Sequence, residues 1–309
     1  MKKIIALLLA AILMLALFAG CGATEETVAE PETEETAATV EPTEEAAETE
    51  EATETEEVAE LTTVVKGKLT VATSPDFAPY EFYAIDENGD PELAGFDMGL
   101  AQYIADYLGL ELEVVPMDFD GVLAELAAGS VDLGMAGLSP DPEREDAMDF
   151  SDIYYEGGQS FVCTTSNADQ FTALADANNP EYSIGAQNGS IQYDLAMENT
   201  PDADVIALTK VTDIIAELVS GKIDGAFIET VVAESYAKNY PELFVAFDVP
   251  YDVEGSAVGV AKGNEGLLAG VNEAIAAALA DGSMDGFVAE ANAKAEGNVY
   301  EGLLEDFAG

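Results

Sequence analysis

A chain of 309 residues with 62 acidic and 10 basic side chains has a formal charge of −52 at pH 7. Such a chain has no basic stripe for nucleic acid or for an anionic membrane surface, so both are excluded as partners. Because 49% of the residues are hydrophobic, the chain holds enough apolar material for one large folded domain or two of ordinary size.

Residues 1–20 are typical of an export signal. Two lysines precede an apolar run that ends at Phe18, and small residues then lead to Cys21. The stretch LFAGCG is similar to a bacterial lipobox, which implies a lipoprotein whose Cys21 is lipidated and becomes the mature N-terminus. A plain membrane-anchor helix is the alternative. Lipidation would leave Cys163 as the only thiol, which excludes a disulfide within the mature chain.

Residues 21–65 are dominated by Glu, Thr, Ala, Val and Pro. A segment of this composition cannot bury enough apolar surface to fold. We therefore predict a disordered acidic linker, which would hold a soluble module at a distance from the membrane.

From Lys66 onward, strand-like and helical patterns alternate. We expect a strand at 68–73, a strand at 110–117 and a helix at 121–129. A further helix is expected at 100–109, with one apolar face formed by Leu100, Ile104, Tyr107 and Leu108. The order predicts a mostly parallel sheet covered by helices. The stretch DENGD at 86–90 lacks the later glutamate of a calcium loop, so we predict a turn between strands and no metal site.

One helix-turn-strand pattern occurs twice. GVLAELAAGSVDLGMAG begins at Gly121, and DIIAELVSGKIDGAFIE begins at Asp213. A chance match is the alternative, but the repeat favours two similar α/β lobes. Ligands bind beyond the carboxyl ends of strands in open parallel sheets, and these ends fall at 137–139 and 228–230. Two facing lobes would bring them together across a cleft.

The region from about Lys68 onward resembles the family-3 extracellular solute-binding proteins, which are the polar amino acid-binding proteins of ABC importers and include glutamine-, histidine- and lysine-arginine-ornithine-binding proteins. The resemblance rests on LTVATSPDFAPYEF, LAGFDMGLAQYIADYLGLELEVVPMDFDGVLAEL, VDLGMAGLSPDPEREDAMDFSDIYY and YSIGAQNGSIQYDLA. It implies an α/β protein with the two-lobed type II periplasmic-binding-protein fold, in which each lobe is a mostly parallel sheet with flanking helices. Lobe 1 is expected at 66–156 and 252–309 and lobe 2 at 157–251, joined by a hinge of two crossovers near 157–162 and 247–252.

The resemblance also implies a site for the ligand's α-carboxylate. Arg144, the only arginine of the chain, matches the family arginine that binds this group. A planar guanidinium makes two parallel hydrogen bonds to a carboxylate, which lysine cannot reproduce. The alternative is a surface pair with Glu143 or Asp146. Gly137 and Ser139 match positions whose backbone and hydroxyl add contacts to the carboxylate.

Other positions match the rest of the family's site. Ser190 matches a hydroxyl that reaches the same carboxylate, or it is a helix N-cap. Glu229 stands where the family usually has an aspartate for the α-ammonium, and the alternative is a solvated acid. Phe77 and Phe119 match rings that enclose the ligand side chain, although phenylalanines at such positions commonly pack in the core. Tyr80 is a third aromatic candidate for the wall.

Three positions at which this sequence differs from its relatives indicate which ligand side chain the site prefers. Ser74 replaces an aspartate of many relatives specific for basic amino acids or glutamine, Gln187 replaces a lysine of some glutamine binders, and Ile228 replaces a polar neighbour. These changes favour a neutral polar amino acid such as glutamine, with arginine and histidine left open. No cofactor and no metal are implied.

The implied function is amino acid transport: an extracytoplasmic, lipid-anchored monomer captures a polar amino acid by hinge closure. It delivers this ligand to an ABC permease, which works with a cytoplasmic ATPase. One alternative is a periplasmic enzyme of the same fold, similar to cyclohexadienyl dehydratase. The chain has no histidine, so Glu229 would be its general acid or base. The other is a ligand-sensing domain, which the lack of a second apolar span disfavours.

Overall fold

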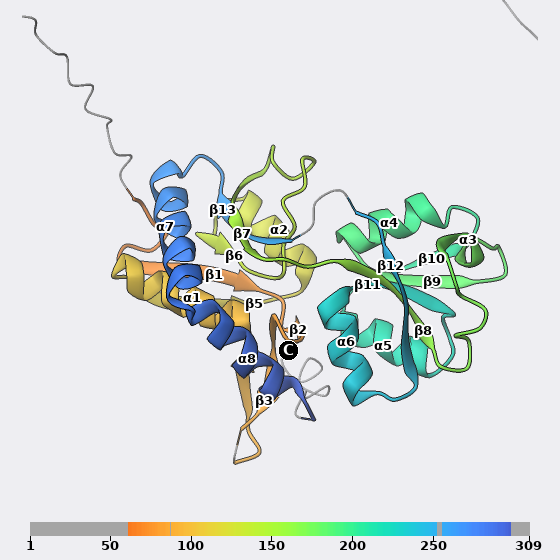
Figure 1. Cartoon of the computed structure of the whole chain (residues 1–309). Helices are drawn as coiled ribbons and strands as arrows, with labels where there is room; N and C mark the ends of the chain where they lie inside the picture. The colour runs from red at the N-terminus through yellow and green to blue at the C-terminus, as the bar shows by residue number, and fades with distance from the viewer. Residues whose placement is uncertain (1–60, 87, 252–254, 298–309) are drawn as a thin grey trace, which may run out of the picture. The chain divides into compact units, whose positions relative to one another are not determined.

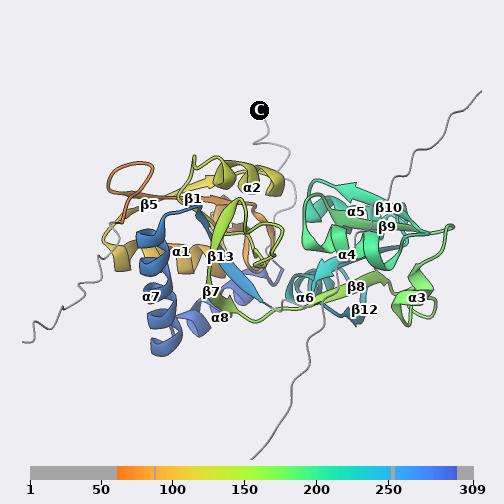
Figure 2. The same cartoon turned by 90° about the horizontal axis from the view of Figure 1, so that it is seen from above.

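The computed structural model describes residues 61–86, 88–251 and 255–297, which form two lobes, each built on a five-stranded sheet (Figures 1 and 2). The predicted signal peptide, the lipidation site Cys21 and residues 21–60 of the predicted linker lie outside the described residues. Within the described ranges, no helix is both long and apolar enough to cross a membrane.

The sheet of lobe 1 has the strand order β5-β1-β6-β13-β7. Its strands are β1 (Lys68–Thr73), β5 (Glu111–Pro116), β6 (Leu133–Gly134), β7 (Met148–Tyr155) and β13 (Ser256–Ala261). Strand β1 is parallel to β5 and β6, whereas β13 is antiparallel to β6 and β7. All strands except β13 therefore run in one direction, as predicted.

The helices of lobe 1 are α1 (Phe96–Leu108), α2 (Phe119–Ala127), α7 (Glu265–Asp281) and α8 (Ser283–Ala295). Helix α1 packs against α7 and α8, and α2 packs on β1, β6 and β13. The predicted apolar face of α1 is wrong at Tyr107, which is 49% exposed, although Leu100 and Ile104 are buried. The buried stripe instead begins one turn earlier, at Phe96 and Asp97.

A small antiparallel sheet extends lobe 1 beside α1. It consists of β2 (Asp76–Phe77), β3 (Glu81–Ile85) and β4 (Pro91–Ala94), in the order β2-β3-β4. Between β3 and β4, the Asp86 carboxylate accepts the backbone N–H groups of Asn88 and Asp90, both at 2.8 Å. The turn predicted for DENGD is therefore confirmed.

The sheet of lobe 2 has the order β10-β9-β11-β8-β12 and repeats the arrangement of lobe 1. Its strands are β8 (Gln159–Thr164), β9 (Ser183–Gln187), β10 (Asp204–Leu208), β11 (Gly225–Glu229) and β12 (Leu243–Val249). Only β8 is antiparallel to its neighbours. Its helices are α3 (Leu174–Ala177), α4 (Ile191–Asn199), α5 (Val211–Val219) and α6 (Thr230–Asn239).

The chain passes between the two sheets twice. Residues 156–158 connect β7 to β8, and residues 250–255 connect β12 to β13, with 252–254 outside the described residues. Cys163 lies buried in β8, where burial raises the pKa of its thiol to about 11. A neutral buried thiol is a weak nucleophile.

The internal repeat corresponds to one structural unit in each lobe. The two copies form α2 and β6 in lobe 1 and α5 and β11 in lobe 2. In lobe 1, Asp132 accepts the backbone N–H of Thr70 in β1 at 2.8 Å. In lobe 2, Asp224 accepts the N–H of Ser183 in β9 at 2.9 Å. The aspartate shared by both copies thus ties each helix-turn-strand unit to the neighbouring parallel strand.

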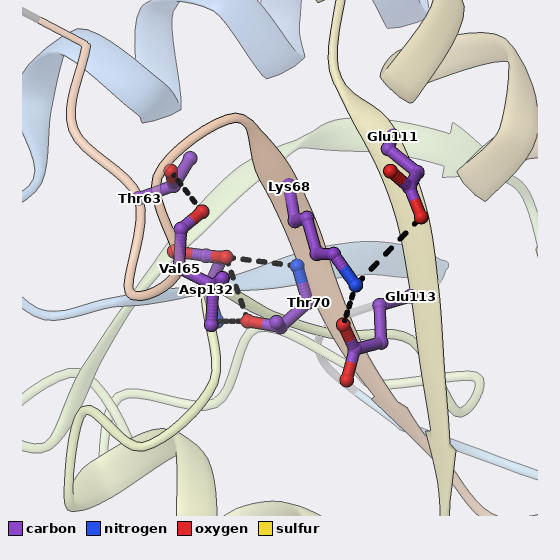
Figure 3. Close-up of polar contacts among 7 residues, drawn as sticks. All are labelled: Thr63, Val65, Lys68, Thr70, Glu111, Glu113 and Asp132. Carbon is purple, nitrogen blue, oxygen red and sulfur yellow. Dashed lines mark hydrogen bonds and ion pairs between the residues drawn. The ribbon is translucent and has the colours of Figure 1, made fainter.

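Asp132 also fixes the N-terminal end of the described chain (Figure 3). Besides the Thr70 N–H, its buried carboxylate accepts the Thr70 hydroxyl at 2.6 Å and the Val64 N–H at 2.7 Å. Contacts with lobe 1 therefore begin within the range 21–65 that the sequence assigns to the linker. Nearby, Lys68 makes ion pairs with Glu111 and Glu113 on the sheet surface.

We expect Asp132→Ala to lower the free energy of unfolding by about 3 kcal/mol, because it leaves the two buried donors of Thr70 without their charged acceptor and releases the partly buried N–H of Val64. Urea denaturation followed by circular dichroism measures this change. Lys68→Ala is the control from the same surface, and it should have much less effect because exposed ion pairs contribute little. Equal losses in the two variants would contradict the assigned role of Asp132.

Candidate functional site

Arg144 lies in the loop between β6 and β7 and contacts both lobes. Its Nη1 donates to the carbonyl of Ser139 at 3.4 Å, and its Nη2 donates to the carbonyl of Gly189 in lobe 2 at 3.1 Å. The guanidinium lies 5.9 Å from the centroid of the Phe119 ring. Among the described residues it forms no ion pair with the neighbouring acids that the alternative interpretation required. The planar fork therefore faces the space between the lobes.

A small cavity lies beside this guanidinium. It is lined by Phe77, Phe119, Ala136, Gly137, Ser139, Arg144, Gln187, Ile191 and Gln192. Six of these residues belong to the site expected from the sequence, and they come from both lobes. Ala136, Ile191 and Gln192 were not predicted, and nothing in their residue types marked them as site residues. The cavity thus has two aromatic walls, a cationic fork and polar groups.

Gly137 allows the first-lobe wall to form. Its φ is +57°, in the left-handed region that favours glycine. A Cβ at this position would lie 2.7 Å from the Phe77 ring. A larger residue at position 137 would therefore clash with the Phe77 ring, and only glycine lets this ring pack against the backbone here.

Gln187 and Ser190 follow β9 in lobe 2. Gln187 lines the cavity and donates its side-chain amide to the carbonyl of Thr209 at 3.3 Å. Ser190 is the N-cap of α4: its hydroxyl accepts the Tyr193 N–H at 3.2 Å and donates to the Gln187 carbonyl at 2.7 Å. The N-cap interpretation of Ser190 is confirmed, and its side chain is not among those lining the cavity.

Glu229 ends β11 and caps α6. Its Oε2 accepts the Val232 N–H at 2.9 Å, and its Oε1 accepts the Tyr80 hydroxyl at 3.4 Å. The residue is only 4% exposed, so the interpretation as a solvated acid is wrong. Burial raises the pKa of Glu229 to about 7, although the backbone N–H groups at the start of α6 oppose this shift. Near neutral pH this carboxyl can therefore gain or lose a proton.

Glu229 and Tyr80 lie outside the cavity of Arg144. Glu229 lines a separate hollow of about 480 Å³ next to the connection at 156–158. Tyr80 is fully buried, and its oxygen accepts the Ser256 hydroxyl at 3.1 Å. Ser74 is also not among the cavity residues. Its hydroxyl donates instead to the Asp76 carboxylate at 2.9 Å.

Two buried acids behind the first-lobe wall were not predicted. Asp97 accepts the Gly137 N–H at 3.2 Å and the Tyr154 hydroxyl at 2.6 Å, and burial raises its pKa to about 6. Glu81 pairs with Phe77 across β2 and β3 and is fully buried, and its carboxyl makes a side-chain hydrogen bond with Asp97. The signal in the sequence was an acid inside each of two apolar stretches, PYEFYAI and LAGFDMG.

Burial, assisted by the charge of Asp97, raises the pKa of Glu81 well above its usual range. Without a cation nearby, burial therefore favours the neutral form of Glu81. A carboxyl group kept neutral by burial becomes ionised when a cation is bound beside it.

Known proteins resemble both the sequence and the fold. Residues 69–290 match the family described as bacterial extracellular solute-binding proteins, family 3. The arginine-binding extracellular protein ArtP of Bacillus subtilis (strain 168) is 34% identical over 204 residues, covering 65% of this chain and 76% of that protein. The cyclohexadienyl dehydratase of Pseudomonas aeruginosa is 29% identical over 177 residues, covering 57% of this chain and 65% of the enzyme.

A solved structure has the same architecture. The amino acid ABC transporter substrate-binding protein AbpA of Streptococcus pneumoniae, bound to L-arginine, superposes with a TM-score of 0.72 at 33% identity. The match covers 75% of this chain and 97% of AbpA. The predicted two-lobed type II periplasmic-binding-protein fold is therefore confirmed. Because the family match spans most of the chain, the chain belongs to the bacterial extracellular solute-binding proteins of family 3.

Proposed function

We propose that this protein captures an amino acid for an ABC importer and that arginine is its preferred ligand. The observation that carries the proposal is the guanidinium of Arg144, which faces a cavity walled by Phe77 and Phe119. A ligand carboxylate would replace the two carbonyl groups that the fork now contacts, and it is the stronger partner because it is charged. Relatives named as arginine-binding proteins support the choice of ligand.

The other predicted residues take the following proposed roles. The Ser139 hydroxyl completes the carboxylate site in lobe 1, and Ser190 approaches it from lobe 2. The Gly137 N–H would have to exchange its present acceptor, Asp97, for the ligand carboxylate. Glu229 accepts the α-ammonium. Its buried carboxylate, held between Tyr80 and the start of α6, would gain a cationic partner when ligand binds. Tyr80, Gln187 and Ser74 would support these residues, and we assign none of the three to a particular atom of the ligand.

The acids behind the cavity favour a cationic side chain over a neutral one. Glu81 and Asp97 adjoin Phe77 and Gly137, which line the cavity. A buried acid ionises only when a partner supplies charge and hydrogen bonds, and the guanidinium of an arginine ligand would supply both. This argument moves the preferred ligand from glutamine to arginine, and it outweighs the loss of an aspartate at Ser74.

The mechanism we propose is closure of the two lobes about the connections at 156–158 and 250–255. Ligand docks on lobe 1, and lobe 2 then closes over it because contacts with both lobes exist only in the closed form. The boundaries of the lobes follow the sequence assignment, 66–156 with 252–309 and 157–251. The loaded monomer would dock on a permease that works with a cytoplasmic ATPase.

We propose that a lipid on Cys21 holds the protein at the outer surface of the cell membrane. The family is extracellular, which is consistent with export by residues 1–20. Residues 21–65 would serve as the tether. Mass spectrometry of the mature N-terminus tests the lipid directly, because an unmodified Cys21 in the native membrane fraction contradicts it.

The experiment that tests the ligand is thermal unfolding of the protein with each common amino acid. A ligand that binds only the folded state raises the melting temperature. We expect the largest rise with arginine. A rise only with glutamine would restore the ligand favoured by the sequence, and no rise with any amino acid would contradict the proposed function.

An enzyme of the dehydratase type is the second candidate. It is favoured by the raised pKa of Glu229, about 7, which suits a general acid or base, and by the similarity to cyclohexadienyl dehydratase. We propose binding rather than catalysis, because the arginine-binding protein ArtP and the arginine-bound AbpA match this chain with higher identity, 34% and 33% against 29%. Incubation with prephenate or arogenate, followed by detection of the aromatic product, separates the two functions.

A further inference from the structure

Asp76 joins lobe 1 to lobe 2 away from the cavity of Arg144. It lies in β2 and is only 3% exposed. Its Oδ2 accepts the backbone N–H of Val211 in lobe 2 at 2.6 Å. Its backbone carbonyl accepts the hydroxyl of Tyr236, from α6 of the same lobe, at 3.0 Å. One residue of lobe 1 thus holds two helices of lobe 2.

The carboxylate of Asp76 takes the place of a helix cap. Val211 is the first residue of α5, and the side chain of Lys210 before it makes no capping hydrogen bond. The first N–H groups of a helix have no partner within the helix, and an acidic side chain is favoured near them. Lobe 1 therefore supplies the cap that the sequence of α5 lacks. Ser74 orients this cap through its bond to Oδ1 at 2.9 Å.

We propose that Asp76 is a positioning residue for ligand capture, whose bond to Val211 across the lobes stabilises the closed, ligand-holding form. The two sheets are joined by the connections at 156–158 and 250–255, so a rotation that separates the lobes must break this bond. An interaction present only in the closed form shifts the population towards it and tightens ligand binding. This inference rests on the proposed function of amino acid capture.

The role depends on the acceptor oxygen rather than on the charge. Burial raises the pKa of Asp76 to about 6, Asp118 favours the neutral form and Lys210 the ionised one. Glu81 is the other acid whose charge interacts with Asp76. In either protonation state the carboxyl keeps an oxygen that accepts the Val211 N–H. Asp76→Asn also keeps such an oxygen, whereas Asp76→Ala removes it.

The bond can be broken from either side. Asp76→Ala removes the acceptor from lobe 1, and Val211→Pro removes the donor from lobe 2. Proline is well tolerated as the first residue of a helix, and Lys210 has the extended backbone (φ −124°, ψ 144°) that a following proline prefers. Asn264→Ala is the matched control, because Asn264 caps α7 within lobe 1 by accepting the Leu267 N–H.

Arginine affinity by calorimetry and the radius of gyration by small-angle X-ray scattering test the proposal. We expect Asp76→Ala and Val211→Pro each to weaken arginine binding about tenfold or more, since a buried hydrogen bond between the lobes is lost from the closed form. The double variant should be no weaker than the singles, because both remove one bond. Asp76→Asn should retain binding, and Asn264→Ala should lower the melting temperature without changing the affinity.

Each outcome bears on the proposal. Affinities of Asp76→Ala and Val211→Pro within about twofold of the wild type would overturn it, as would an Asp76→Asn variant as weak as Asp76→Ala. A lower melting temperature with unchanged affinity and radius would make Asp76 merely structural. If the wild type binds no amino acid, the proposed function fails. In that case the radius of gyration of the ligand-free protein tests the role of Asp76. This radius must be larger in Asp76→Ala and Val211→Pro than in the wild type.

Discussion

Arg144→Ala is expected to weaken arginine binding on the order of 100-fold or more. The variant removes two parallel charge-assisted hydrogen bonds to the ligand carboxylate and leaves that charge without a partner in a closed cavity. Isothermal titration calorimetry measures the loss. The melting temperature of the ligand-free protein should change little, because the guanidinium makes two hydrogen bonds to backbone carbonyls, of Ser139 and Gly189, and lies over the Phe119 ring, but forms no ion pair within the described residues.

Two variants separate the hydrogen-bond geometry of Arg144 from its positive charge. Arg144→Lys keeps the positive charge but cannot make both parallel bonds, so its affinity should lie well below that of the wild type. Lys262→Ala removes one positive charge near the same loop, where Lys262 pairs with Asp149 and contacts the carbonyl of Glu145. Lys262→Ala should bind arginine as the wild type does. Unchanged affinity in Arg144→Ala would show that the carboxylate binds elsewhere.

The part of the site that could be predicted lies where local sequence determines local structure. Gly137, Ser139 and Arg144 follow one strand within a few residues, so their order in the chain places them together. The repeat was similarly informative, because Asp132 and Asp224 each serve their own lobe through the neighbouring strand. The strand end at 137–139 and the repeat need only the rules for strands, helices and the edges of parallel sheets, whereas the roles of Ser139 and Arg144 were implied by the resemblance to the family.

The rest depends on contacts between residues far apart in the chain. Asp76 and Val211 are 135 positions apart, and no periodicity links them. Ser74 was considered only because relatives carry an aspartate at this position, and its hydroxyl donates to Asp76, two residues along the chain, beside this contact between the lobes. Tyr107 fitted a helical face by spacing alone, but the buried stripe of α1 is set by α7 and α8, which come much later in the chain.

Glu81→Gln is expected to weaken arginine binding about tenfold or more, while glutamine binding changes little. The guanidinium would lose its anionic partner behind Phe77, whereas a neutral ligand never paired with that charge. In the absence of ligand the variant should have a higher melting temperature at and above neutral pH. Burial raises the pKa of Glu81 in the folded protein, so as pH rises the unfolded chain loses this proton first and the wild type loses stability.

The pH dependence of binding gives the sharper test. Burial favours the neutral form of Glu81, and a guanidinium bound beside it would favour the anion, so we expect arginine binding to release protons and affinity to rise with pH. Glu229 has a pKa of about 7, so binding of any ligand with an α-ammonium would also release protons from this residue into solution. Titrations between about pH 6 and pH 8 should therefore show a steeper rise for arginine than for glutamine.

Glu81→Gln should reduce the arginine slope to that of glutamine, because only the share of Glu229 remains. Glu125→Gln is the matched control, since it makes the same chemical change on the exposed face of α2. It should leave both slopes unchanged. If Glu81→Gln retains the wild-type affinity and slope for arginine, the buried acid does not meet the ligand side chain, and the preference for a cationic ligand loses its structural basis.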